Sequence, residues 1–141
     1  MEIKFLRMSP PQALNKLESA MASGYQMIDI IRTDFQKNQS IADQKFEEWK
    51  KQYFAWVNQV LVILQEVYYP ISKAFYFRDA KTTRYAKTGD VKITGIEQAV
   101  EVRMEIIKEY SDFILNQSHP SITINGNLNF QVGEKLSNNQ S

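Results

Sequence analysis

Five carboxylates recur along one predicted helix, and a row of this kind can bind a hard cation or a basic partner. They lie at three- and four-residue spacing, at Glu97, Glu101, Glu105, Glu109 and Asp112. That spacing places them on one helix face. A Mg²⁺ or Ca²⁺ site usually takes its ligands from several elements, and the sequence offers no second carboxylate cluster. We therefore predict a solvated acidic face and no metal site.

A basic stretch between residues 73 and 92 combines cations with aromatic side chains. Cations contact phosphates and aromatic rings stack on bases, which is a common way to bind single-stranded nucleic acid. The candidate nucleic-acid contacts are Lys73, Arg78, Lys81, Arg84, Lys87 and Lys92, with Phe75, Tyr76, Phe77 and Tyr85 among them. The alternative is that this stretch lies against the acidic helix, because residues 97–112 carry the opposite net charge. We favour this second interpretation.

Residues for nucleophilic or metal-dependent catalysis are scarce. The chain has no cysteine and one histidine, His119, which precedes Pro120. Cysteine nucleophiles, thiolate metal sites and disulfides are therefore excluded. The sequence contains no glycine-rich phosphate loop, nucleophile elbow or metalloprotease helix. We expect no enzymatic activity and no cofactor.

The C-terminal residues change from helical to strand periodicity after Pro120. The apolar side chains alternate at Ile122, Ile124, Leu128, Phe130 and Val132, as in a half-buried strand. A hairpin with a three-residue loop at 125–127 keeps them on one face, and so does one unbroken strand. Because an isolated hairpin is marginal in water, it must pack on the helices, pair with residues 2–7, or add to a strand of a partner or a second copy.

The first predicted helix covers residues 10–37. Ser9, Pro10 and Gln12 form a helix start signal, with an N-cap, a proline in the first turn and a glutamine three residues after the cap. The apolar seam is Leu14, Leu17, Met21, Gly24, Ile28, Ile31 and Phe35. Gly24 lies on this seam, where it would let another backbone approach closely. The alternative is a break into two helices at Gly24.

A second helix is predicted from a cap at Ser40 to Pro70, antiparallel to the first because the link between them is short. Its main seam is Phe46, Trp49, Tyr53, Trp56, Val60, Ile63 and Val67, and a second seam is Phe54, Val57, Leu61, Leu64 and Tyr68. Residues 53–69 are thus apolar almost all round, which is typical of a central helix or a subunit contact. We assign both tryptophans to the core.

Residues 71–77 are predicted to add a further helical turn or two, followed by a polar, basic loop over 78–93. Thr94 is the expected cap of a third long helix that ends near residue 116. Arg103 falls within the apolar arc of this helix. It is either a member of a buried ion pair or a side chain that extends to solvent from the edge of the arc.

Composition agrees with one mainly α domain. The 141 residues are 43% hydrophobic and 23% charged, with 17 basic and 16 acidic side chains, so no global field favours nucleic acid or a membrane surface. The longest apolar run, residues 60–64, is too short to span a bilayer. The N-terminus lacks the apolar core of a signal peptide, and we expect a cytoplasmic protein.

The predicted fold class is an antiparallel bundle of three long helices with a short C-terminal β-hairpin or strand. In domain terms, residues 1–119 form the helical bundle, 120–132 the β appendage and 133–141 a flexible tail.

The order of these features resembles helical accessory modules of bacterial and mobile-element proteins, which often lie beside effector domains in defence systems. The resemblance covers residues 14–115: Trp49 early in a long helix, Phe75 after a proline, a basic loop, and the helix TGIEQAVEVRMEIIKEY. It implies an adaptor or assembly role and transfers no functional residue. We therefore expect a protein partner or a second copy, bound through the aromatic-rich second helix and the tail, with nucleic-acid binding as the alternative.

Overall fold

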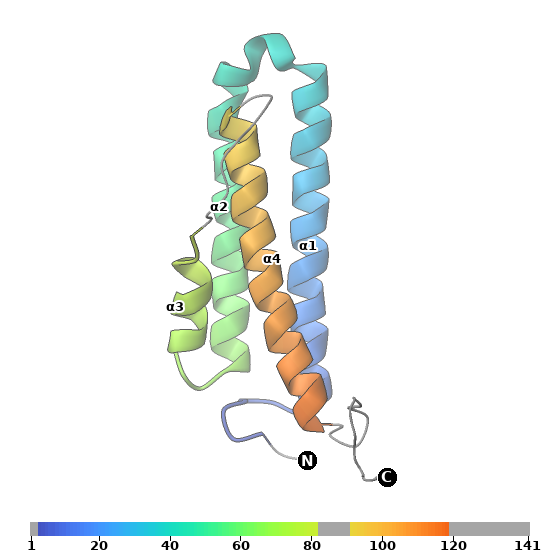
Figure 1. The fold of residues 1–141 in the computed structure, drawn as a ribbon, viewed down its shortest axis with the longest axis vertical. Coiled ribbons are helices and arrows are strands. Elements are labelled where there is room, and N and C mark those ends of the chain that lie inside the picture. The colour runs from blue at the N-terminus through green and yellow to red at the C-terminus, as the bar shows by residue number, and fades with distance from the viewer. Residues whose placement is uncertain (1–2, 82–90, 119–141) are drawn as a thin grey trace.

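Three long helices run side by side, with a short fourth helix packed beside them (Figure 1). The computed structural model describes residues 3–81 and 91–118. In these ranges the α-helices are α1 (Pro10–Lys37), α2 (Ala42–Val67), α3 (Ser72–Arg78) and α4 (Val91–Ser118), with a 3₁₀ turn, η1 (Gln39–Ile41), between the first two. α1 is antiparallel to α2 and α4, and α3 folds back along α2. The predicted mainly helical class is confirmed.

α1 begins where the sequence predicts and continues without a break. The Ser9 hydroxyl accepts a bond from the Gln12 backbone amide, and the Gln12 side chain accepts one from the Ser9 amide. This capping box satisfies two of the amide groups that a helix start leaves unpaired. The alternative of two helices separated at Gly24 is wrong, because the helix runs through that position to Lys37.

Gly24 is the point where the three long helices meet. A Cβ atom at this position would lie 2.7 Å and 2.8 Å from indole atoms of Trp56 on α2, and it would also overlap the Met104 methyl group on α4. The prediction that another backbone approaches Gly24 is therefore wrong, because the nearest atoms are the side chains of Trp56 and Met104. The Trp56 indole N–H donates to the Ala20 carbonyl at 3.0 Å, which fixes the ring at this junction.

The start of α2 differs from the prediction. Residues 39–41 form the 3₁₀ turn, so Ser40 is not the N-cap, and Ile41 holds that position without a side-chain hydrogen bond. The connection is fixed instead by Asp34 on α1. Its carboxylate accepts the Trp49 indole N–H at 2.8 Å and lies 3.1 Å from the Lys45 ammonium. These contacts lower the pKa of Asp34, with the Trp49 bond the largest cause.

α2 supplies much of the core but is not buried all round. Its main seam faces inward, with Trp49, Tyr53, Trp56, Val60 and Val67 buried, and the assignment of both tryptophans to the core is confirmed. The second seam is divided. Val57, Leu64 and Tyr68 are buried, whereas Phe54 is 54% exposed. The helix is central on one side and uncovered on the other.

The chain leaves α2 through a short extended pairing with the N-terminal segment. Tyr68 is extended and forms an antiparallel bridge with Leu6. The Arg7 amide donates to Val67 at 2.8 Å and the Tyr69 amide to Phe5 at 2.9 Å. The structure thus pairs residues 5–7 with residues 67–69, whereas the C-terminal tail, the other predicted partner of residues 2–7, lies outside the described residues.

α3 and α4 modify the predicted boundaries. The expected extra turns after Pro70 are confirmed as α3. α4 starts at Val91, so Thr94 lies within the helix and is not its cap. The burial of Ile93 gives a physical reason, because an earlier start packs this side chain into the core. The predicted β appendage over 120–132 and the tail over 133–141 lie outside the described residues.

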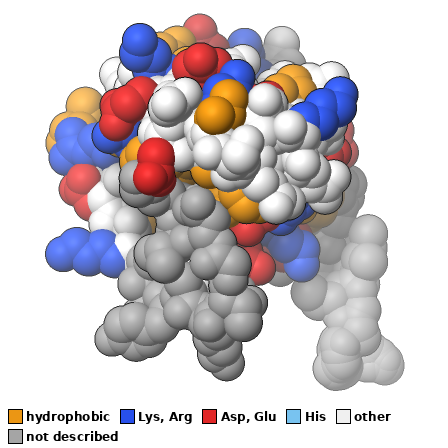
Figure 2. Space-filling view, turned by 90° about the horizontal axis from the view of Figure 1, so that it is seen from above, with side chains coloured by type: hydrophobic (Ala, Val, Ile, Leu, Met, Phe, Trp, Pro, Cys, Tyr) orange, Lys and Arg blue, Asp and Glu red, His pale blue; other side chains and the backbone are white. Residues whose placement is uncertain are grey.

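Among residues 3–81 and 91–118, no helix has both the length and the apolar character that crossing a bilayer requires. Seen from above, acidic and basic side chains are interspersed over the end of the bundle that carries η1 (Figure 2). The visible surface at this end is thus of mixed charge, in agreement with the nearly neutral composition.

Candidate docking groove between α1 and α4

A groove of about 450 Å³ runs between α1 and α4. α1 contributes Met21, Tyr25, Ile28 and Arg32, and α4 contributes Thr94, Glu97, Gln98, Val100, Glu101, Met104, Glu105 and Lys108. The residues on α1 follow 4-3-4 spacing, so one face of that helix forms the whole wall. From Thr94 to Lys108 the groove spans about 21 Å at ~1.5 Å per residue.

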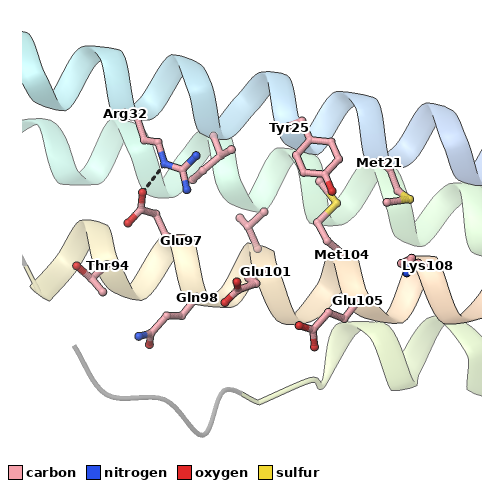
Figure 3. A pocket seen from close by; sticks show the side chains of 12 residues that line it. Met21, Tyr25, Arg32, Thr94, Glu97, Gln98, Glu101, Met104, Glu105 and Lys108 are labelled. Carbon is pink, nitrogen blue, oxygen red and sulfur yellow. Dashed lines mark hydrogen bonds and ion pairs between the residues drawn. The ribbon is translucent and has the colours of Figure 1, made fainter. Parts of the chain in front are cut away.

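The floor of the groove is apolar and rests on the junction at Gly24. Ile28, Val100 and Met104 are buried, and Met21 is partly buried. Figure 3 shows Met104 extending from α4 toward Tyr25 on α1. Tyr25 stays 55% exposed, so a large aromatic ring borders an apolar floor. Methionine side chains adapt to irregular surfaces, and this floor therefore suits an apolar side chain from a ligand.

The rim of the groove is charged, mainly by α4. Glu97 pairs with Arg32 across one end of the groove, as the dashed line in Figure 3 marks. Glu101 and Glu105 follow on α4, and Lys108 lies at the other end. The predicted acidic face of the third helix is thus one wall of a groove. In the described part of the chain, no group of three or more acidic or histidine side chains is arranged to hold a metal ion.

A second hollow, of about 600 Å³, lies on the other side of α4. α3 and the residues after it contribute Phe75, Tyr76, Asp79, Ala80 and Lys81, and α4 contributes Val102, Glu105, Ile106 and Glu109. Lys81 therefore lies in one hollow with two α4 glutamates. Residues 82–90, which form much of the basic stretch, lie outside the described residues, so the packing of this stretch against the acidic helix stays a prediction.

Lys73, the first of the candidate nucleic-acid contacts, faces a group of aromatic rings. Its ammonium nitrogen lies 4.9 Å from the ring centre of Tyr110, 5.4 Å from that of Phe5, 5.5 Å from that of Tyr68 and 6.0 Å from that of Phe113. The Tyr110 hydroxyl donates to the Lys73 carbonyl at 2.8 Å. A cation held over several ring faces is stabilised where it lies, so Lys73 joins the N-terminal segment, α2, α3 and α4.

The other candidate contacts are divided between the described and undescribed parts of the chain. Arg78 pairs with Asp79 at 2.8 Å and lies over the Phe75 ring at 4.4 Å. This pairing raises the pKa of Arg78 and lowers that of Asp79. Arg84 and Lys87 lie outside the described residues. So do the side chain of Lys92 and the tail residues Ile122, Ile124, Leu128, Phe130 and Val132.

Arg103 is 9% exposed and lies between α4, α2 and α3. Its Nη2 donates to the Arg78 carbonyl at 2.6 Å and its Nη1 to the Ala99 carbonyl at 3.2 Å. The guanidinium also lies 5.8 Å from the ring centres of Tyr53 and Phe77. The interpretation that Arg103 extends to solvent is wrong. Its charge holds the C-terminal end of α3, where helix carbonyls favour a cation.

The sequence predicts both helix faces that form the walls of the groove, but it does not predict that these two faces lie next to each other. Met21 and Ile28 belong to the predicted seam of the first helix, and the glutamates to the predicted acidic row. Tyr25 is not among the predicted site residues, because it is one residue away from that seam. Its four-residue spacing from Met21 was the available signal. No protein-family model, curated protein or solved structure matches this chain.

Proposed function

We propose that this protein is a non-enzymatic adaptor or assembly module, and that it binds an amphipathic helix of a protein partner in the groove between α1 and α4. The supporting observation is an apolar floor between two 28-residue helices with a glutamate-bearing rim. Helix-in-groove binding places apolar anchors on such a floor. The exposed Tyr25 ring is of the residue type that often dominates binding energy at interfaces.

The charges on the rim define the chemistry of the proposed partner. The α4 wall carries Glu97, Glu101 and Glu105, with Lys108 at its far end, whereas α1 contributes Arg32, which pairs with Glu97. A partner helix with lysine or arginine beside its apolar stripe would place those cations along α4. Complementary charge of this kind sets orientation and suppresses wrong partners more than it adds affinity. The cytoplasmic location and the role beside an effector protein remain part of this proposal.

Site-specific photo-crosslinking in the host tests the proposal. A photoreactive phenylalanine analogue replaces Tyr25 in the groove, and in a matched control it replaces Tyr76 in the hollow beyond α4. The two tyrosines are 55% and 58% exposed. We expect position 25 to crosslink to one protein, at a segment with an apolar stripe flanked by lysine or arginine, and position 76 not to crosslink to that segment. Equal crosslinking from both positions, or an acidic segment at position 25, would contradict the proposal.

The alternative function is nucleic-acid binding through residues 73–92. In the described part of the chain, no contact favours it. Lys73 faces aromatic rings and Arg78 is paired with Asp79. We therefore predict that a triple variant with Lys81, Arg84 and Lys87 replaced by glutamate is retained on immobilised single-stranded DNA or RNA to the same extent as the native chain, at low and at high salt. Retention by the native chain that this triple variant loses would instead support nucleic-acid binding.

A further inference from the structure

The outer face of α2 carries a stripe of mostly exposed side chains. We define the α2 stripe as Phe54, Asn58, Leu61, Val62 and Gln65. Their spacing places them on one side of the helix. Phe54 and Val62 are 54% and 57% exposed, Asn58 and Gln65 are also exposed, and Leu61 is partly buried. The stripe lies away from Trp56 and Val60, which face the core.

The α2 stripe carries no charge, which distinguishes it from the exposed glutamate row of α4. No lysine, arginine, aspartate or glutamate occurs between Lys51 and Glu66, a distance of about 22 Å along a helix at ~1.5 Å per residue. The outer side of α4 carries the glutamate row over a comparable length. The α2 stripe therefore has no charged side chain that could form an ion pair with a charged partner.

From these features we propose that the α2 stripe is a homodimer interface in which two copies of α2 pack antiparallel about a two-fold axis. A two-fold interface uses the same patch on both copies, so the patch must be self-complementary. An uncharged stripe does not repel its own copy. Asn58 and Gln65 carry both donors and acceptors, so their amides can bond to the amides or carbonyls of the second copy.

The charges that bracket the stripe select the antiparallel orientation. Lys51 lies at one end and Glu66 at the other, and both are exposed. Antiparallel packing centred near Asn58 brings Lys51 of each copy to the level of Glu66 of the other. Parallel packing would place like charges together. Glu66 is also 3.2 Å from Lys16 on α1, with half of its side chain exposed, so it can share a second cation.

One helix face is a small contact area, and the dimer is accordingly expected to be weak. Stable interfaces bury about 800 Å² on each partner, which is more than a single stripe of five residues provides. The mass must therefore be measured over a concentration series. This inference does not depend on the α1–α4 groove, because the two surfaces share no residue.

Sedimentation equilibrium of the full chain tests the proposal. We expect the mass to rise with concentration from 16.4 kDa to twice that value. Val62→Glu should keep the mass at one chain, because the contact would bury a carboxylate in place of an apolar side chain. Tyr25→Glu is the matched control, since its side chain is equally exposed but lines the groove, and it should dimerise like the native chain.

Three results would overturn the proposal: a native mass of one chain at every concentration, a Val62→Glu variant that dimerises like the native chain, or assembly beyond two copies. Disulfide crosslinking gives a second measurement, because a covalent bond traps the dimer even when its affinity is weak. Because the chain has no cysteine, Asn58→Cys introduces a single thiol near the proposed axis. Mild oxidation should join Asn58→Cys chains into disulfide-linked dimers and leave Tyr25→Cys chains largely monomeric. Equal yields from the two variants would contradict the proposed axis.

Discussion

The groove between α1 and α4 and the hollow between α3 and α4 share one acidic helix and differ in the wall opposite to it. α1 presents an unbroken helix face with one cation, and that cation is paired at the end of the groove. α3 is seven residues long, and the chain after it brings Asp79 and Lys81 into the hollow. The same glutamate row thus borders a long helix face with an apolar floor on the α1 side and a short helix with the chain after it on the α3 side.

This difference shows that the acidic row alone does not define a binding surface. On the α3 side the hollow is lined by one cation, Lys81, together with Asp79, Glu105 and Glu109, and the wall opposite α4 is a short helix. On the α1 side the apolar floor adds the surface that a partner can bury. A charged helix face therefore becomes a candidate site only through the element that packs against it.

The largest expected effect removes the support that both surfaces share. Trp56→Ala deletes an indole that packs on Gly24, bonds to Ala20 and contacts Phe77 of α3 edge-on. We predict a loss of about 3–5 kcal/mol in the free energy of unfolding, measured by urea denaturation. Phe54→Ala, two positions away on the exposed side, should change it by less than about 0.5 kcal/mol. Similar losses of unfolding free energy from both variants would show that the Phe54 side of α2 is buried as well.

The next effect separates the two surfaces. Arg103→Met removes the bond to the Arg78 carbonyl at the end of α3 and the cation near Phe77. Leaving that carbonyl without its partner should lower stability by about 1–3 kcal/mol. Hydrogen exchange should become faster in α3 while the amides of α1 along the groove keep their protection. Equal loss of protection in α1 would mean that the two surfaces are coupled.

A smaller effect acts on the floor of the groove. Gly24→Ala introduces a Cβ that overlaps Trp56 and Met104. Overpacking typically destabilises by about 1–3 kcal/mol, and the better helix propensity of alanine offsets about 1 kcal/mol. We predict a net loss of up to about 2 kcal/mol, measured by thermal or urea unfolding. A variant more stable than the native chain would show that Met104 and Trp56 can move apart freely.

The smallest effect concerns the aromatic group around Lys73. Burial raises the pKa of Tyr110 to about 12, whereas a tyrosine in an unfolded chain ionises near 10. Between about pH 10 and 12 the unfolded chain has therefore released a proton that the folded chain still holds, and stability falls as pH rises. Unfolding curves at a series of alkaline pH values should show this fall. Tyr110→Phe should make it shallower, and an unchanged slope would contradict the assignment.

Features that depend on neighbouring residues could be predicted from the sequence. The capping box at Ser9, the continuous seam of α1 and the end of α2 before Pro70 all follow from local spacing and proline geometry, and the structure confirms them. The two helix starts that were wrong, at Ser40 and Thr94, had capping residues in the right pattern. There, the 3₁₀ turn and the burial of Ile93 determined the boundary.

The groove could not be predicted because it depends on which helices become neighbours. The acidic row and the seam of α1 were both visible, yet nothing in their spacing states that α1 packs against α4 along Met104. Gly24 was the strongest available sign of close packing, and it identified the position but not the two side chains that fill it. Arg103 is similar, since its partner carbonyl is 25 residues away in the chain.

The most direct test of the central claim compares crosslinking from position 25 in two charge-reversal backgrounds. Glu101 borders the groove, whereas Glu109 borders the hollow on the other side of α4. If a basic helix lies in the groove, Glu101→Lys should reduce the crosslink yield several-fold and Glu109→Lys should leave it nearly unchanged. Equal losses from both reversals, or no loss from Glu101→Lys, would contradict the claim that the α1–α4 groove recognises a basic partner.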